Sequence, residues 1–318
     1  QLKQQIREVL SRAGANDVLS YSFVHGDLLK KAGQDPAQAF TLRNALSPDL
    51  QYYRLSLLPG LLDKVRMNIK AGYDEFTLFE LGKTHQKYPS DEPAALPDEH
   101  NVLELVYTSK SPKPGAAYYQ LLRQVDLLLS ELGIPYRLDV PSAETIEDPK
   151  LKIQSEKPYN MSRTAYLRYK YAEQGGTIGF IGELEPSVTR AFKLPEYTAA
   201  ACIMLDGQSF ESENRNTKNH YTPLSKYPST DQDITLKVSA DTSYAKLEGL
   251  IKRIVKDTDY QSKVDPVAIF QEEGSDTKNV SFRITLTHHQ RTLTTEEVNK
   301  LISTIAFTAK DELGATQV

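Results

Sequence analysis

The sequence predicts an α+β protein of two domains, built from antiparallel strands with helices interspersed. Three observations support this prediction. The chain has 318 residues, more than a single hydrophobic core usually holds. Short segments rich in β-branched and aromatic residues recur between amphipathic helical segments. A polar stretch with two prolines follows Phe210 and divides this pattern into two parts.

The first part begins with an amphipathic helix and continues with strands and further helices. Apolar residues such as Leu2 and Ile6 fall on one helical stripe, which stops at Gly14. Pro59 suits the first turn of a second helix, and Gly72 follows its last turn. The predicted helices are 2–13, 57–71 and 116–133, and the predicted strands are 17–24, 76–86, 101–109, 164–172 and 177–184.

The second part has a regular order of elements. It runs through strand 232–239, helix 242–255, strands 264–271 and 278–288, helix 294–314 and a short last strand in the terminal ATQV. This βαββαβ order predicts a ferredoxin-like sandwich. Thr294 and Glu297 predict a capping box at the start of the last helix. We therefore expect a first domain in 1–215, a linker in 216–228 and a second domain in 229–318.

Composition limits the classes of function. With 39% hydrophobic and 25% charged residues, and no apolar run of roughly 20 residues, the chain is expected to be soluble and without a membrane partner. It opens on Gln1 without a charged and apolar leader, which argues against a signal peptide and suggests a piece of a longer protein. Cys202, the only cysteine, is expected to be a buried, inert thiol, which fits a reducing cytoplasm. The net charge of −4 means that any RNA binding must rest on a local surface.

Three motifs could suggest a chemical site, but each has a simpler structural interpretation. Glu183 and Glu185 would share one strand face and could hold a metal, although a solvated strand end is favoured. His288 and His289 would face opposite sides of a strand and are expected on the surface. The glycines of GTIGFIGE lie inside a predicted strand, so we expect close packing or a bulge and no phosphate loop.

Strand alternation predicts an open sheet face in the second domain. It assigns these residues to the side that faces the helices: Val280, Phe282, Ile284, Leu286, Ile234, Leu236, Val238, Val267 and Ile269. Ala268, Phe270, Arg283 and Lys237 then face outward. An aromatic beside cationic side chains is the arrangement with which RNA-binding sheets stack an unpaired base and hold its backbone. A lone aromatic that seals the sheet edge is the alternative.

Three blocks of the sequence resemble the beta subunits of bacterial phenylalanine–tRNA ligases. The first is NALSPDLQYYRLSLLPGLL followed by FTLFELG, the second is SRTAYLRYKYAEQGGTIGFIGELEP, and the third is SKYPSTDQDITLKV with the later QRTLTTEEV. This chain departs from the family pattern at three places. Ser162 stands where the family usually has Gly, and Glu185 where it usually has His. Asp231 and Gln232 stand where it usually has two arginines. The residues matched in the first block are Asn44, Leu46, Ser47, Pro48, Arg54, Ser56, Leu57, Leu58, Pro59, Gly60, Leu61, Leu62, Phe79, Glu80 and Gly82.

The resemblance implies that residues 1–215 form a degenerate, noncatalytic copy of the class II synthetase catalytic fold, and that 229–318 form a ferredoxin-fold anticodon-binding domain. The stretches equivalent to two signature motifs read FELGKTHQKYPSDEP and AAACIMLDGQSF, and neither supplies the arginine with which active relatives bind ATP. Lys83 and His85 lie near the first position, but a lysine does not replace a bidentate arginine. We expect no catalytic residue, metal or cofactor in this chain, while the holoenzyme uses ATP and Mg²⁺.

The resemblance also implies partners and candidate contacts. Expected partners are a catalytic alpha subunit and tRNA-Phe, in a cytoplasmic alpha2–beta2 heterotetramer, with helices 2–13 and 57–71 presenting apolar surface to the alpha subunit. Phe270 matches an aromatic that meets the anticodon, Ala268 falls where a relative can carry an acidic contact, and Ala315 matches another position near the anticodon. The candidate tRNA-binding residues are Phe270, Arg283, Lys237, Ala268 and Ala315.

Two other functions stay open at this point. A self-sufficient ligase is opposed by the missing arginines. A ferredoxin-like ligand-sensing or protein-interaction module on a degenerate synthetase fold would need a dimer interface on the sheet face in place of Phe270 and Arg283. RNA binding would distinguish this module from an anticodon-binding domain.

Overall fold

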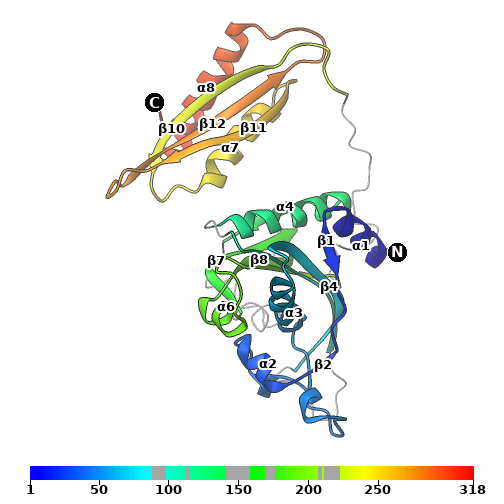
Figure 1. Cartoon of the computed structure of the whole chain (residues 1–318). Helices are drawn as coiled ribbons and strands as arrows, with labels where there is room; N and C mark the ends of the chain where they lie inside the picture. Colours follow the sequence, from blue (N-terminus) through cyan, green and yellow to red (C-terminus); the bar gives the residue numbers. More distant parts are fainter. Residues whose placement is uncertain (88–97, 112–114, 141–157, 170–175, 207–209, 211–222) are drawn as a thin grey trace. The chain divides into compact units, whose positions relative to one another are not determined.

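The computed structural model describes residues 1–87, 98–111, 115–140, 158–169, 176–206, 210 and 223–318 (Figure 1). They belong to two compact units, Gln1–Asn219 and His220–Val318. The predicted linker 216–228 lies in part outside the described residues. Antiparallel sheets with interspersed helices confirm the α+β prediction. Among the described helices, none combines the length and the apolar character needed to span a membrane.

The first unit is built on a seven-stranded sheet with the order β1-β4-β5-β9-β8-β7-β6. Only the β1–β4 pair is parallel among the neighbouring strands described here. The strands are β1 (Ala15–Asp17), β4 (Glu75–Gln86), β5 (Asp98–Ser109), β6 (Tyr136–Asp139), β7 (Tyr159–Tyr169), β8 (Thr177–Leu184) and β9 (Ala199–Met204).

Helices cover both faces of this sheet. α1 (Leu2–Arg12) and α4 (Ala116–Glu131) pack on one face, and α3 (Leu58–Lys70) and α6 (Pro186–Phe192) pack on the other (Figure 1). The apolar stripes of α1 and α3 are therefore buried in the core of the chain itself. The expectation that these two helices present a large apolar surface to a partner is wrong, although Met67 on α3 is exposed.

A smaller substructure precedes α3. It consists of β2 (Phe23–Val24), α2 (Gly26–Lys31), the 3-10 turns Pro36–Gln38 and Pro48–Leu50, and β3 (Tyr52–Tyr53), which pairs with β2. The predicted strand 17–24 is wrong, because the structure divides it between β1 and β2. Ser20 lies between these two strands. Its hydroxyl donates to Glu80 and its carbonyl accepts from Arg54, so this carbonyl bonds a side chain and not a neighbouring strand.

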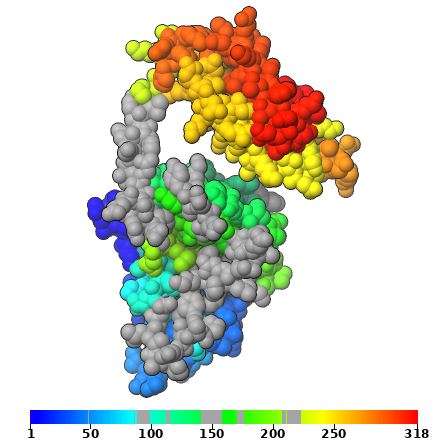
Figure 2. All heavy atoms as spheres, turned by 180° about the vertical axis from the view of Figure 1, so that it is seen from behind, coloured from blue at the N-terminus to red at the C-terminus, as the bar shows by residue number. Residues whose placement is uncertain are grey.

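The second unit has a four-stranded antiparallel sheet with the order β11-β12-β10-β13. Its elements confirm the predicted βαββαβ order: β10 (Thr230–Ser239), α7 (Tyr244–Lys256), β11 (Gln261–Phe270), β12 (Thr277–Thr287), α8 (Thr295–Leu313) and β13 (Thr316–Gln317). The predicted capping box between Thr294 and Glu297 is present. α7 and α8 pack on one face of the sheet and leave the other face open. Figure 2 shows this unit from behind as a closely packed body coloured yellow to red.

Candidate functional sites

A row of buried side chains crosses the first sheet. Glu80 on β4 lies opposite Glu104 on β5, Glu104 lies opposite Cys202 on β9, and the row continues through Phe180 and Tyr166. Residues directly opposite each other on antiparallel strands point to the same face. All five therefore lie on the face that α3 covers, and each is at most 2% exposed.

Arg54 joins this row to the segment that leads into α3. Its Nη1 donates to Glu80 Oε1 at 2.7 Å and to Ser20 Oγ at 3.1 Å, and its Nε donates to the Lys83 carbonyl at 3.0 Å. The side chains of Arg54 and Glu80 are 6% and 0% exposed. A Cβ atom at Gly82 would lie 2.5 Å from Arg54 Nη2, so a larger residue would displace the guanidinium. Arg54, Glu80 and Gly82, which stand apart in the sequence, form one structural unit.

Glu104 lies beside this ion pair. It forms hydrogen bonds with the backbone of Leu57 and with Cys202, while its Oε2 has no hydrogen-bond partner among the described residues. Burial raises the pKa of Glu104 to about 8, and the two hydrogen bonds oppose part of that rise. Cys202 is a buried free cysteine, as predicted, and burial raises the pKa of its thiol well above the ordinary value. The polar groups of this row hold α3 on the sheet.

We expect Glu104→Gln to remove a pH dependence from the stability of the first unit. Because the pKa of Glu104 rises from 4.5 to about 8 on folding, the folded state keeps a proton that the unfolded state releases. The free energy of unfolding therefore falls as the pH rises from 4.5 through about 8. At about 1.4 kcal/mol per pKa unit, the loss in the wild type is on the order of a few kcal/mol. Urea unfolding followed by circular dichroism at both ends of this range measures it.

The control for this measurement is Glu131→Gln, which changes an exposed carboxylate on α4. It should keep the pH profile of the wild type. Parallel profiles for the wild type and Glu104→Gln would show that Glu104 does not carry the extra proton in the folded state.

In the described part of the two stretches that would have to bind ATP, Lys83 and His85 both contact a carboxylate. Lys83 forms an ion pair with Glu99 Oε2, and His85 Nε2 lies 3.1 Å from Glu99 Oε1. The Lys83 and His85 contacts lower the pKa of the Glu99 carboxyl. Residues 88–93 and 207–209 of these stretches lie outside the described residues. In the part of the chain that is described, no group of three or more His, Cys, Asp or Glu residues could hold a metal ion.

The segment with three glycines has the structural role expected of it, whereas its carboxylate pair does not. Thr177–Leu184 is strand β8, and a Cβ atom at Gly179 would lie 2.1 Å from the Cys202 carbonyl, which confirms close packing. Glu183 is not the solvated residue that the sequence suggested. It is buried, and it forms an ion pair with Arg163.

The open face of the second sheet carries the candidate RNA contacts in three neighbouring rows. Each row runs from β11 through β12 to β10, and the members of a row share the open side. The rows are Phe270–Asn279–Lys237, Ala268–Ser281–Thr235 and Asp265–Arg283–Asp233.

Phe270 is 65% exposed at the end of the edge strand β11. The predicted burial of Val267 and Ile269 is wrong, because they are 51% and 57% exposed. The register shifts between Pro266 and Ala268, which leaves Val267 unpaired in a bulge. Among the described strands, β11 has one neighbour, β12, and its last residues, 266–270, are all exposed. Three large apolar side chains are thus exposed at one sheet edge.

Arg283 is held by an acidic neighbour, Asp233, on the adjacent strand β10. Its Nε donates to Asp233 Oδ1 at 2.8 Å and its Nη2 to Asp233 Oδ2 at 2.7 Å. This contact lowers the pKa of the Asp233 carboxyl. Lys263 pairs with Asp265 at 2.7 Å on the same face. The register of β10 with β12, which sets Asp233 opposite Arg283, was the signal that could have revealed the pair.

The other candidates occupy different surroundings. Lys237 and Ala268 are exposed on the open face, and Lys237 forms no ion pair within the described residues. Ala315 is fully buried among the core residues of the second unit, so its side chain is not available to a ligand on the open face. The cations Lys237, Lys263 and Arg283 are balanced by the carboxylates of Asp231, Asp233 and Asp265. This face therefore carries no net positive charge.

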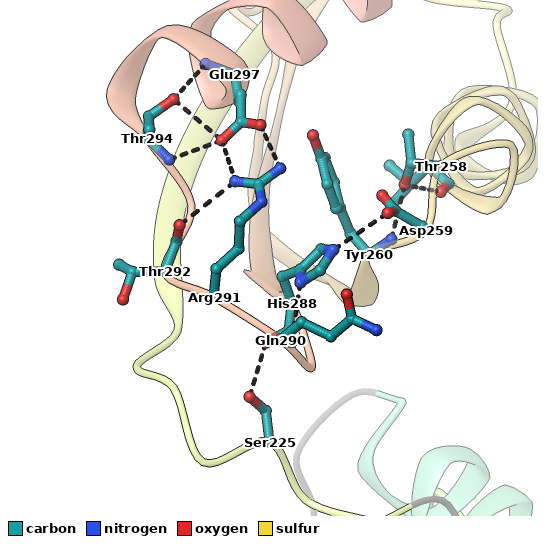
Figure 3. A network of polar contacts seen from close by, with 11 residues as sticks. Ser225, Thr258, Asp259, Tyr260, His288, Gln290, Arg291, Thr292, Thr294 and Glu297 are labelled. Atoms are coloured by element: carbon teal, nitrogen blue, oxygen red, sulfur yellow. Dashed lines mark hydrogen bonds and ion pairs between the residues drawn. The ribbon is translucent and has the colours of Figure 1, made fainter.

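The end of β12 carries a polar network that looks like a site but has a structural role (Figure 3). The expectation that His288 lies on the surface is wrong, because it is 8% exposed. Its Nε2 lies 3.1 Å from Asp259 Oδ2, its Nδ1 accepts from the backbone N–H of Gln290 at 3.0 Å, and its carbonyl accepts from Ser225 Oγ at 2.8 Å. Arg291 continues the network to the capping box of α8. These bonds join the segment entering the unit to β12 and α8, whereas His289 is exposed.

Comparisons with known proteins cover both units. The family model of the phenylalanyl tRNA synthetase beta chain CLM domain matches residues 1–205, and that of the ferredoxin-fold anticodon binding domain matches residues 225–317. The phenylalanine–tRNA ligase beta subunit of Clostridium tetani is 27% identical over 325 residues, covering 99% of this chain and 37% of that protein. The subunit of Clostridium acetobutylicum is 25% identical, with the same coverage. This chain thus spans little more than a third of the length of these relatives.

Among solved structures, a pyrrolysyl tRNA synthetase, PylSc of Desulfitobacterium hafniense, aligns with a TM-score of 0.49 and 15% sequence identity. The alignment covers 64% of this chain and 63% of that chain.

Proposed function

The chain belongs to the family of phenylalanyl tRNA synthetase beta chains, and on this premise we propose that it scaffolds a catalytic alpha subunit and binds the anticodon region of tRNA-Phe. The observation that carries this proposal is the contrast between the two sheets. On the first sheet, the face bearing the buried row is closed by α3, whereas the second sheet has an open face with an exposed aromatic. The proposed holoenzyme is a cytoplasmic alpha2–beta2 ligase.

In this proposal, the first unit does not activate an amino acid. In-line displacement on ATP requires cationic groups placed around the phosphates, usually with metal ions. Arg54 is hydrogen-bonded to Glu80 and Ser20, and Lys83 forms an ion pair with Glu99. The residues 58–65 of α3 pack against the face where the buried row lies. ATP and Mg²⁺ would then be bound by the alpha subunit.

A surface near the start of α3 is the better candidate for contact with the alpha subunit. Leu19 is 88% and Tyr21 59% exposed, and both line a hollow of about 310 Å³ that also reaches Arg54 and Gly60. Large exposed apolar side chains beside a hollow are typical of docking surfaces. We propose this surface as the contact in place of helices 2–13 and 57–71, because the apolar stripes of those helices are buried.

The proposal is tested by pyrophosphate exchange and sedimentation of the chain, alone and mixed with an alpha subunit from the same source. Alone, the chain should show no phenylalanine-dependent exchange, because neither motif stretch supplies the arginine with which active relatives bind ATP. Mixed with the alpha subunit, it should sediment as a larger complex. Leu19→Asp should weaken that complex, whereas Met67→Asp, at an exposed position on α3, should leave it intact.

Robust exchange by the chain alone would contradict the noncatalytic role. Failure to associate, or equal weakening by Met67→Asp, would contradict the proposed docking surface.

The proposed RNA contact of the second unit rests on stacking more than on charge. Phe270 offers an exposed ring, and an aromatic side chain contributes roughly 1–3 kcal/mol per stacked base. The balanced charges of the open face give little general attraction to a phosphate backbone. Lys237 is the candidate for a single phosphate contact.

A second candidate function is a protein-interaction module, which the exposed edge of β11 favours. Val267, Ile269 and Phe270 expose apolar side chains on β11, which is an edge strand among the described residues. Such an edge can accept a strand from another protein. Titration of the complete chain with tRNA-Phe distinguishes the two functions, because a protein-docking edge would show no dependence on the anticodon.

A further inference from the structure

Asn279 occupies the position next to Phe270 on the open sheet face. The two residues are register partners on β11 and β12, and Lys237 on β10 is the partner of Asn279 on its other side. Side chains at directly opposite positions have Cβ atoms about 4.5–5.5 Å apart. A nucleic-acid base is wider than a phenyl ring. A base stacked on Phe270 would therefore extend over Asn279.

The amide of Asn279 is available to such a base. It is partly exposed and makes no side-chain hydrogen bond within the described residues. An asparagine amide offers one acceptor and two donor hydrogens, which match the mixed donors and acceptors of a base edge. Asn279 was not among the candidate RNA contacts predicted from the sequence.

The neighbouring polar groups on β12 are already paired within the sheet. Ser281 Oγ lies 2.8 Å from Thr235 Oγ1, and Arg283 makes its two bonds to Asp233. A base that used these groups would have to break existing hydrogen bonds. Within the described residues, only the row through Phe270 combines a ring for stacking, an amide without a hydrogen-bond partner and a cation without an ion pair.

We propose that Asn279 reads the edge of the anticodon base that stacks on Phe270, and that Lys237 contacts the adjoining phosphate. This inference rests on the proposed function of the second unit. It assigns base discrimination to the amide and base affinity to the ring. The two contributions can therefore be separated by mutation.

The test uses the reconstituted alpha–beta holoenzyme. Wild type, Asn279→Ala and Phe270→Ala are titrated with tRNA-Phe and with tRNA-Phe in which each anticodon base is replaced in turn. Loss of one or two hydrogen bonds should reduce the discrimination at one anticodon position about tenfold in Asn279→Ala, with the other positions unchanged. Phe270→Ala should weaken binding of the native tRNA itself. Asn299→Ala, an exposed asparagine on the helical side, is the matched control and should change neither quantity.

The outcomes separate the inference from the function on which it rests. Unchanged discrimination in Asn279→Ala together with weaker binding in Phe270→Ala would overturn the role of Asn279 and leave the stacking contact in place. Uniform weakening of all tRNAs in Asn279→Ala would assign the amide to the RNA backbone and also overturn it. Normal binding in both variants would overturn the proposed function. If Asn279→Ala does not fold, the uncharged Asn279→Ser carries the same test, because it stays polar but loses the amide.

Discussion

Arg54→Ala is expected to lower the free energy of unfolding of the first unit by about 3–5 kcal/mol, the usual cost of breaking a buried ion pair from one side. Without the guanidinium, the carboxylate of Glu80 would remain fully buried, and Ser20 Oγ, 2.6 Å away, would be its one remaining side-chain donor among the described residues. The segment leading into α3 would also lose its bond to the Lys83 carbonyl. Urea unfolding of wild type and variant, followed by circular dichroism, measures the difference.

A double-mutant cycle makes this test specific. Glu80→Gln in the Arg54→Ala background removes the buried charge and should recover a large part of the lost stability. Arg54→Lys keeps a positive charge but cannot reproduce all the bonds of the guanidinium, so it should fall between wild type and alanine. If the loss of unfolding free energy in the double variant equals the sum of the losses in the two single variants, the ion pair does not account for the instability of Arg54→Ala.

Phe270→Ala is expected to weaken the binding of tRNA-Phe to the holoenzyme by roughly 1–3 kcal/mol, the contribution of one stacked base. The side chain is 65% exposed and lies outside the core of its unit, so its removal should change folding stability little. Phe270→Tyr keeps the ring and should bind nearly as the wild type does. The measurement is a titration with native tRNA-Phe and with a tRNA of altered anticodon.

Arg283→Ala provides a comparison on the same face. Because Arg283 is paired with Asp233, its loss should change tRNA binding less than loss of the ring does. An unchanged preference for the native anticodon in Phe270→Ala would mean that the ring only covers the sheet edge. The protein-docking alternative for β11 would then be favoured.

The sequence predicted the elements of the second unit well because their signals are local. Alternating apolar residues, the capping box at Thr294 and short connections define each element without reference to distant residues. β9 was missed for the opposite reason. It is a central strand with helices on both faces, so Ala199–Met204 is apolar without alternation and lacks a local strand signal.

The candidate sites were predicted less completely because they depend on pairing between strands. Alternation alone placed Phe270 outward, but it could not reveal the shift after Pro266 that exposes Val267. The pairing of Asp233 with Arg283 follows from the register of β10 with β12, which local patterns do not set. The partner of the buried His288 is Asp259, which lies 29 positions earlier in the chain. In each case the missing information was a contact between segments.

The balanced charge of the open face has a consequence for the kinetics of tRNA binding. Oppositely charged surfaces accelerate encounter, and that acceleration falls steeply as salt is added. The side chains around Phe270, where Arg283 is neutralised by Asp233, provide no such steering. Arrival of the anticodon at this face should proceed at an ordinary diffusional rate that varies little with ionic strength. Differences between cognate and non-cognate tRNAs should then appear in the lifetime of the complex, which is set by the dissociation rate constant.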